Sequence, residues 1–166
     1  EPTRTLARAS LFKLSGDDVD AAMEASLEAA GPEARAELIQ SLAARSVTKA
    51  KASFRRCLGD DAEAVRMAAA QGLTGLGSEE DASALVTYFK FAKTDAEREI
   101  AERALSAICA RYPLPCLRLI LNAMAECQGD PRIALLRMLS SIGGPEALNV
   151  VRNEMKAADP KLKDAA

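Results

Sequence analysis

Four cysteines are the side chains best suited to chemistry in this sequence, and no histidine accompanies them. They are Cys57, Cys109, Cys116 and Cys127. Without an imidazole, the sequence lacks the usual general base, the usual zinc ligand and any Ser-His or Cys-His arrangement. No two cysteines form a C-x-x-C motif, so neither a zinc ribbon nor a thioredoxin-like site is indicated. We therefore expect no metal site and no cofactor.

Cys109 and Cys116 flank a short turn that contains two prolines. We expect this turn to bring their Cα atoms within the ~4.4–6.8 Å that a disulfide requires. The sequence thus predicts a Cys109–Cys116 disulfide; the alternative is two half-buried free thiols in a cytosolic protein. Cys57 and Cys127 lie two repeats apart in the register given below, on the order of 20 Å, and are not expected to pair. The predicted disulfide favours a periplasmic or secreted chain over a cytoplasmic one.

Adjacent carboxylates occur where helices are expected to begin, at Asp17 and Asp18, Asp60 and Asp61, and residues 79–81. At those positions they complement the positive end of the helix dipole. A catalytic carboxylate pair would instead have to face another carboxylate across a cleft. We therefore interpret these residues as structural and expect the chain not to be an enzyme.

The elements that must position these side chains follow from a repeated pair, an arginine with a leucine seven residues later. The arginines are Arg4, Arg35, Arg66, Arg98 and Arg132, and the leucines are Leu11, Leu42, Leu73, Leu105 and Leu139. Apolar residues also stand three and ten positions after each arginine, with Arg45 as the exception. Offsets of 0, 3, 7 and 10 fall on one face of an α-helix. The arginine-bearing segments, which we call B helices, are therefore expected near residues 2–15, 32–46, 61–77, 94–111 and 130–143.

Two further apolar columns, 19 and 23 residues after each arginine, predict a second amphipathic helix in every repeat. These A helices are expected near residues 17–30, 47–59, 79–93, 114–128 and 145–157. Glycine, proline and N-capping aspartate or threonine residues separate the helices. Residues 158–166 have little to bury and are expected to form a frayed tail.

A single helix pair of this kind cannot bury its apolar stripes, whereas stacked pairs share a continuous core. The expected fold is therefore all-α: a right-handed α-α superhelix, a HEAT-like solenoid of about five stacked helix pairs over residues 1–157, without strands. Neither terminal helix has the polar face of a capping repeat. We accordingly expect the chain to be a fragment of a larger multidomain protein, or its ends to self-associate.

The period, the alanine-rich B helices and the Arg-x6-Leu pattern resemble bacterial HEAT-like repeats, of the kind grouped with phycobilisome-lyase-type HEAT repeats. The best match is DAEAVRMAAAQGLTGLG at residues 61–77. The pattern AIC-x6-C at residues 107–116 is similar to HEAT arrays of large secreted bacterial proteins. We call the five arginines of the repeats the arginine ladder. The resemblance implies that they bind carboxylates or carbonyls of the turns, such as those of Asp61, Asp95 and Asp130. An anion-binding stripe is the alternative.

The resemblance also implies that the B helices line the concave surface, where a column of small residues runs beside a column of longer polar ones. The candidate partner-binding residues are Gln40, Gln71, Thr74, Glu99, Arg103 and Arg137. Gln40, Gln71, Arg103 and Arg137 occupy the same position in successive repeats and are expected to lie in one row. An ordinary solvated face is the alternative. Tyr88 and Phe91 are expected either to form a convex contact patch or to pack against a neighbouring helix.

Composition narrows the function. Lys and Arg number 22 against 24 Asp and Glu, a formal net charge of -2, and this balance argues against phosphate-backbone binding. No apolar run approaches the roughly 20 residues of a membrane span. We therefore predict a non-catalytic protein-interaction or scaffold module that binds another protein, or neighbouring domains of its parent chain, and neither nucleic acid nor a membrane. The alternatives are a HEAT-like lyase or chaperone for a small ligand such as a bilin, a HEAT-like DNA glycosylase, and a structural spacer.

Overall fold

The computed structural model describes residues 16–156, and every regular element in that range is a helix. The predicted all-α class is therefore confirmed for this part of the chain. The B helix expected near residues 2–15, with Arg4, and the tail expected at residues 158–166 lie outside the described residues.

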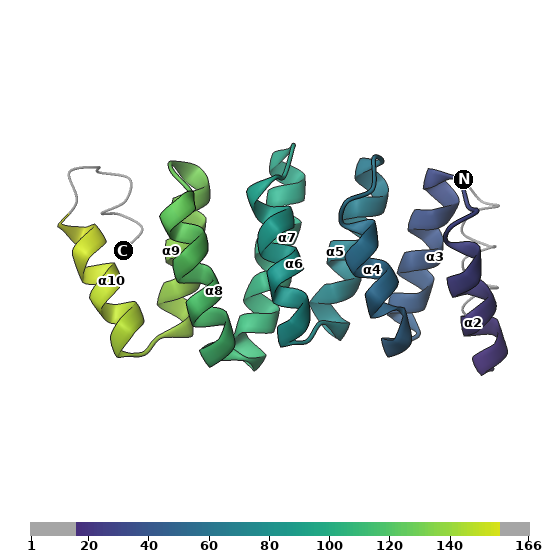
Figure 1. Cartoon of the computed structure of the whole chain (residues 1–166), viewed down its shortest axis with the longest axis horizontal. Helices are drawn as coiled ribbons and strands as arrows, with labels where there is room; N and C mark the ends of the chain where they lie inside the picture. The colour runs from purple at the N-terminus through teal and green to yellow at the C-terminus, as the bar shows by residue number, and fades with distance from the viewer. Residues whose placement is uncertain (1–15, 157–166) are drawn as a thin grey trace. The chain divides into compact units, whose positions relative to one another are not determined.

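The chain divides into two compact units, Glu1–Gly77 and Ser78–Ala166. The first unit contains the helices α2 (Asp17–Ser26), α3 (Pro32–Ala44), α4 (Lys51–Cys57), preceded by the 3-10 turn η1 (Thr48–Ala50), and α5 (Glu63–Leu76) (Figure 1). The second contains α6 (Glu79–Lys90), α7 (Asp95–Arg111), α8 (Pro113–Glu126), α9 (Asp130–Ile142) and α10 (Pro145–Met155). The B helices are α3, α5, α7 and α9, and the A helices are the even-numbered ones.

The first unit is held together by α3 packed on α5, with α2 against α3 and α4 against α5. Leu42, Phe54 and Leu73, which belong to the predicted apolar columns, have no exposed surface. Gly72 permits the close contact of α4 with α5. A Cβ atom added there would lie 2.9 Å from Cε2 of Phe54 and 3.3 Å from Cβ of Ala43. The position therefore requires glycine because real Cβ atoms do not approach a ring so closely.

In the second unit α6 packs on α7 and α8, and α9 packs on α7, α8 and α10. Leu85, Phe89, Leu105 and Leu139, again from the apolar columns, are fully buried. In α8 the column residues Leu117 and Leu121 are only half-buried, and Cys116 and Ile120 occupy the interior instead. The boundary at Gly77 falls between a B helix and an A helix, where the repeat pattern does not change.

The end of α3 shows how a non-glycine residue can close a helix. Ser46 has a φ of 59°, in the left-handed region. Its N–H donates to the carbonyl of Ala43, and the N–H of Val47 donates to the carbonyl of Leu42, both at 3.0 Å. This is the Schellman pattern of hydrogen bonds. Cys109 stands eleven residues after Arg98, as Ser46 does after Arg35, but it lies inside α7, which continues to Arg111.

Tyr88 belongs to the interior and not to an exposed patch. Its side chain is buried, and its hydroxyl donates to Oε1 of Glu97 at 3.4 Å. The other carboxylate oxygen of Glu97 accepts the N–H groups of Lys93 and Thr94 at 2.8 and 3.2 Å. Glu97 is thereby buried as part of a capping box that begins α7. Phe91, in contrast, is 72% exposed.

Candidate interaction face

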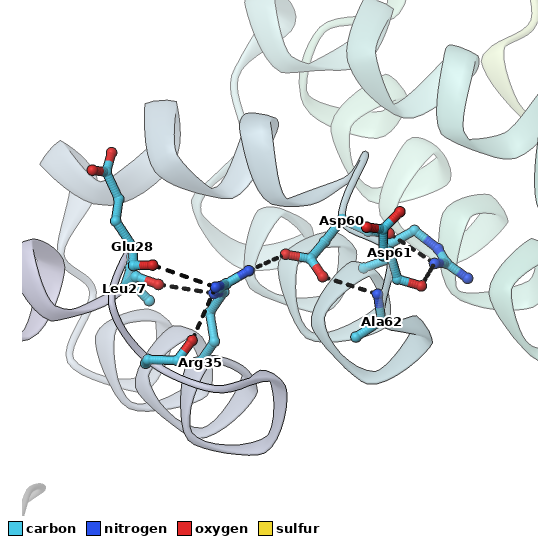
Figure 2. Close-up of polar contacts among 8 residues, drawn as sticks. Leu27, Glu28, Arg35, Asp60, Asp61 and Ala62 are labelled. Atoms are coloured by element: carbon cyan, nitrogen blue, oxygen red, sulfur yellow. Dashed lines mark hydrogen bonds and ion pairs between the residues drawn. The ribbon is translucent and has the colours of Figure 1, made fainter.

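Arg35 joins the end of α2 to the turn before α5 (Figure 2). Its Nε donates to the carbonyl of Leu27 at 2.8 Å, and Nη2 donates to the carbonyl of Ala30 at 2.9 Å. Its Nη1 forms an ion pair with Asp60. The Asp60 carboxylate also accepts the N–H of Ala62 at 2.9 Å, next to the first turn of α5. One planar guanidinium therefore fixes the ends of two helices, the role that its fork of donors suits.

Two other arginines of the ladder also bond to turn or helix-end carbonyls. Arg66 is buried and donates from Nη1 to the carbonyls of Asp60 and Asp61 at 2.8 and 2.7 Å. Arg132 donates to the carbonyl of Met124 and forms an ion pair with Glu154. The expected contact to Asp61 is therefore made through its carbonyl. The ion pair of Arg132 with Glu154 connects α9 to α10.

Arg98 differs from the other arginines of the ladder. Its Nη1 pairs with Asp95 at 2.7 Å, as expected, but the Asp95 side chain is 94% exposed. The buried Nε of Arg98 has no hydrogen-bond partner within the described part of the chain. This position therefore contributes less bracing than that of Arg35.

The B-helix face of the first unit contains a cavity of about 350 Å³ between α3 and α5. Gln40 is half-buried and Gln71 is exposed, and both line the cavity. Small residues form most of the remaining wall. The full set is Gln40, Ser41, Ala43, Ala44, Ala68, Gln71 and Gly72. The structure therefore brings two of the candidate partner-binding residues to one cavity.

The other candidate residues are distributed over both units. Thr74 is half-buried, and its hydroxyl donates to the carbonyl of Ala70 at 3.2 Å. Glu99 and Arg103 are exposed on α7, and Arg137 is exposed on α9, which packs against α7. The continuous row of four residues across the B helices stays a prediction.

Ser41 lines the cavity and was missed by the sequence analysis. Its side chain is 2% exposed, and its Oγ has no hydrogen-bond partner among the described residues. Other helical hydroxyls donate to the carbonyl four residues earlier, as Ser140 does to Leu136 at 3.0 Å. One signal was available: the position six residues after the ladder arginine holds Gly72, Ala104 and Met138 in the other described repeats, all buried. Ser41 is the polar residue in that column.

Cys109 and Cys116 are free thiols, so the predicted disulfide is not present. Both are buried, and they lie close enough for a hydrogen bond between them. Burial raises the pKa of both thiols. The hydrogen bond raises the pKa of Cys109 further and lowers that of Cys116, which identifies Cys109 as the donor. Cys127 is also a buried free thiol, with a pKa raised mainly by burial.

Cys57 lies beside the Arg35–Asp60 pair in a second cavity, of about 270 Å³. Its pKa is raised, first by burial and then by the charge of Asp60, while Arg35 and Arg56 act in the opposite direction. The thiol form is therefore favoured at neutral pH, and the nucleophilic thiolate is not.

Residues 16–156 lack two further features. No group of three or more His, Cys, Asp or Glu side chains there is arranged to hold a metal ion. No helix there combines the length and the apolar character needed to cross a bilayer.

Comparison with known proteins matches residues 19–108, more than half of the 166-residue chain, to the family described as HEAT repeats. A solved structure of similar fold is the complex of CpcE and CpcF of phycocyanin lyase from Nostoc sp. PCC7120. Its chain is 20% identical, with a TM-score of 0.56, and the match covers 96% of this chain and 68% of that one. No curated protein matches the chain. The family match and the structural likeness agree with the resemblance stated from the sequence.

Proposed function

Because the chain belongs to the HEAT repeat family, we propose that it is a non-catalytic protein-interaction or scaffold module. Its partner is another protein or a neighbouring domain of its parent chain, bound through the B-helix face of α3 and α5. The observation that carries the proposal is the cavity of about 350 Å³ on that face, lined by Gln40 and Gln71. Helical repeats present extended surfaces of this kind to protein partners. Glu99, Arg103 and Arg137 offer further contacts in the second unit.

The chemistry of the described residues supports a non-catalytic role. All four thiols have raised pKa values, so none is activated as a nucleophile. The two fully buried carboxylates described in the second unit, those of Asp81 and Glu97, accept backbone N–H groups in helix caps. A site for catalysis would instead hold a perturbed acid, base or nucleophile directed into a cleft.

Site-directed photo-crosslinking tests the proposal. A benzophenone amino acid replaces Gln71, and in a matched variant it replaces Ala52, which is exposed on α4 and does not line the cavity. Each variant is irradiated in an extract of the source cells. We expect a discrete protein adduct from position 71 and none from position 52. Identical adducts from both positions, or no adduct from position 71, would contradict binding through this face.

A second candidate is a lyase or chaperone that holds a small ligand, which the fold likeness to the phycocyanin lyase complex favours. The cavity of about 350 Å³ lies at the lower end of the roughly 300–1,000 Å³ typical of small-molecule sites. A titration with a bilin separates this candidate from the first. A saturable change in the absorption spectrum of the bilin supports ligand handling, and an unchanged spectrum removes it.

We also propose that the chain resides in an extracytoplasmic compartment, as a periplasmic or secreted protein. An oxidising, extracytoplasmic compartment would let Cys109 and Cys116 exchange with a disulfide such as oxidised glutathione. Both thiols lose their hydrogens to form one disulfide, and two molecules of reduced glutathione leave. Intact mass after incubation with oxidised glutathione measures the loss of two hydrogens. An unchanged mass, with both thiols alkylated under denaturing conditions, would argue for a chain that keeps its thiols reduced.

A further inference from the structure

The cavity between α3 and α5 contains a buried hydroxyl group that the fold does not use. Ser41 is 2% exposed, and its Oγ has no hydrogen-bond partner within the described part of the chain. Buried polar groups are almost always hydrogen-bonded, so an unpaired one indicates a missing partner. Rotation about χ1 moves the hydroxyl among three staggered positions. A group bound in the cavity can therefore supply the partner.

The wall of this cavity is neutral and forms hydrogen bonds. None of its seven lining residues carries a charge. Each glutamine amide offers two N–H donors and an acceptor oxygen, and the Ser41 hydroxyl offers one donor and accepts as well. A charged group would lose its hydration there without a counter-charge from the lining residues. An apolar group would leave the Ser41 hydroxyl unpaired.

We propose that the cavity binds the primary carboxamide of an asparagine or glutamine side chain of the partner protein. The inference rests on the proposed function and names the group that the face recognises. A carboxamide carries two N–H donors and one carbonyl acceptor, which match the Ser41 hydroxyl and the amides of Gln40 and Gln71. A backbone peptide unit carries only one N–H donor. The cavity of about 350 Å³ exceeds the ~30 Å³ share of one water molecule by roughly tenfold, so it admits the carboxamide with its methylene stem.

Small residues form the wall of the cavity on both helices. Gly72 and Ala68 present no long side chain to the cavity, and Ala43 and Ala44 do the same on α3. A projecting side chain can therefore enter the cavity, and the Ser41 hydroxyl, which lies below the accessible surface, meets it by rotation about χ1. Gln71, which is exposed, lies where it can close over the bound group.

Titration with small probes, followed by NMR of the ¹⁵N-labelled chain, tests this inference. The probes are propionamide, its charged isostere propionate, and N-methylacetamide as the analogue of a backbone peptide. We expect propionamide to shift the side-chain amide signals of Gln40 and Gln71 saturably, with at least about tenfold higher affinity than either other probe. Ser41→Ala should weaken propionamide about fivefold, as the loss of one hydrogen bond implies. Gln71→Glu, at an exposed position, should also weaken it.

The matched control is Ser140→Ala, because Ser140 lies in the second unit and its hydroxyl is bonded within α9. It should leave the propionamide affinity unchanged. Equal binding of propionate or N-methylacetamide would overturn the choice of a carboxamide. No shift with propionamide, or an unchanged affinity in Ser41→Ala, would overturn the site itself. A cross-linked partner at position 71 together with no propionamide binding would retain the interaction face and refute only its recognition of a carboxamide.

Discussion

Cys109 and Cys116 show how burial decides the chemistry of a side chain. The two thiols lie within hydrogen-bonding reach, and burial raises the pKa of each. A buried thiol stays protonated in the folded chain at a pH at which the unfolded chain has lost the proton. The pair therefore links folding stability to pH.

Above about pH 9, the ordinary pKa of a thiol, the unfolded chain releases a proton from Cys109 that the folded chain retains. The folded state then binds more protons, so the free energy of unfolding falls as the pH rises. The contribution of Cys109 is fully present below pH 9. We expect Cys109→Ala to flatten this fall by about 1.4 kcal/mol per pH unit above pH 9, measured by urea unfolding at several pH values. Parallel curves for the two proteins would contradict the raised pKa.

Ser46 holds a left-handed conformation that costs a residue with a Cβ atom about 1 kcal/mol more than glycine. Replacing it with glycine keeps both hydrogen bonds of the Schellman pattern. We expect Ser46→Gly to raise the free energy of unfolding by about 0.5–1 kcal/mol, part of the gain being offset by the freer unfolded chain. Gly143, with a φ of 74°, is the reverse control, and Gly143→Ser should destabilise the chain. A lower free energy of unfolding for Ser46→Gly would contradict the presence of backbone strain at this position.

At the scale of helices, the ladder arginines and Gly72 determine how neighbouring elements meet. Arg35 bonds to the end of α2 and to Asp60, whereas the equivalent Arg98 forms one ion pair with a largely exposed aspartate. The same residue type at the same repeat position therefore contributes differently to the free energy of unfolding. The difference follows from burial and from the number of hydrogen bonds.

We expect Arg35→Ala to lower the free energy of unfolding by about 2–3 kcal/mol, because it leaves the partly buried Asp60 carboxylate and two helix-end carbonyls without their donor. Arg98→Ala should cost less than about 1 kcal/mol, since exposed ion pairs contribute little. Chemical denaturation of both variants measures the difference. Equal losses would show that the ladder acts through position alone.

Gly72 and Gly75 form a matched pair on α5. A Cβ atom at Gly72 would lie 2.9 Å from the buried ring of Phe54, whereas one at Gly75 would meet nothing within 4 Å. We expect Gly72→Ala to destabilise the chain by about 1–2 kcal/mol, because overpacking exceeds the gain in helix propensity. Gly75→Ala should stabilise it by up to about 1 kcal/mol. The order of their thermal midpoints decides, and a more stable Gly72→Ala would contradict the packing of α4 on α5.

The helices could be predicted because burial of an apolar stripe imposes a period that the sequence displays directly. Leu42, Leu73 and Leu105 were placed in the core in this way, and all three are buried. Interaction partners across turns could not be predicted. Asp60 and Asp61 are adjacent residues of the same type, and only the backbone geometry determines that the carboxylate of Asp60 pairs with Arg35. The unpaired hydroxyl of Ser41 was missed because hydroxyls in helices normally bond to their own backbone.

At the scale of the whole molecule, the chain belongs to the HEAT repeat family and forms two compact units. The sequence did not indicate their boundary at Gly77, since the repeat continues through it unchanged. Each unit buries most of its own apolar columns and exposes polar residues of its B helices. We therefore propose that the protein offers a surface to a partner, with the α3–α5 face as the contact.

The dissociation constant for the partner identified by crosslinking tests this claim most directly. It is measured for the unaltered chain, for Gln71→Arg, which adds a long side chain beside the cavity, and for Ala52→Arg, which adds the same side chain on α4. We predict that Gln71→Arg weakens binding by at least about tenfold, or ~1.4 kcal/mol, while Ala52→Arg changes it less than about twofold. Unchanged binding by Gln71→Arg, or an equal loss in both variants, would contradict a contact through the α3–α5 face.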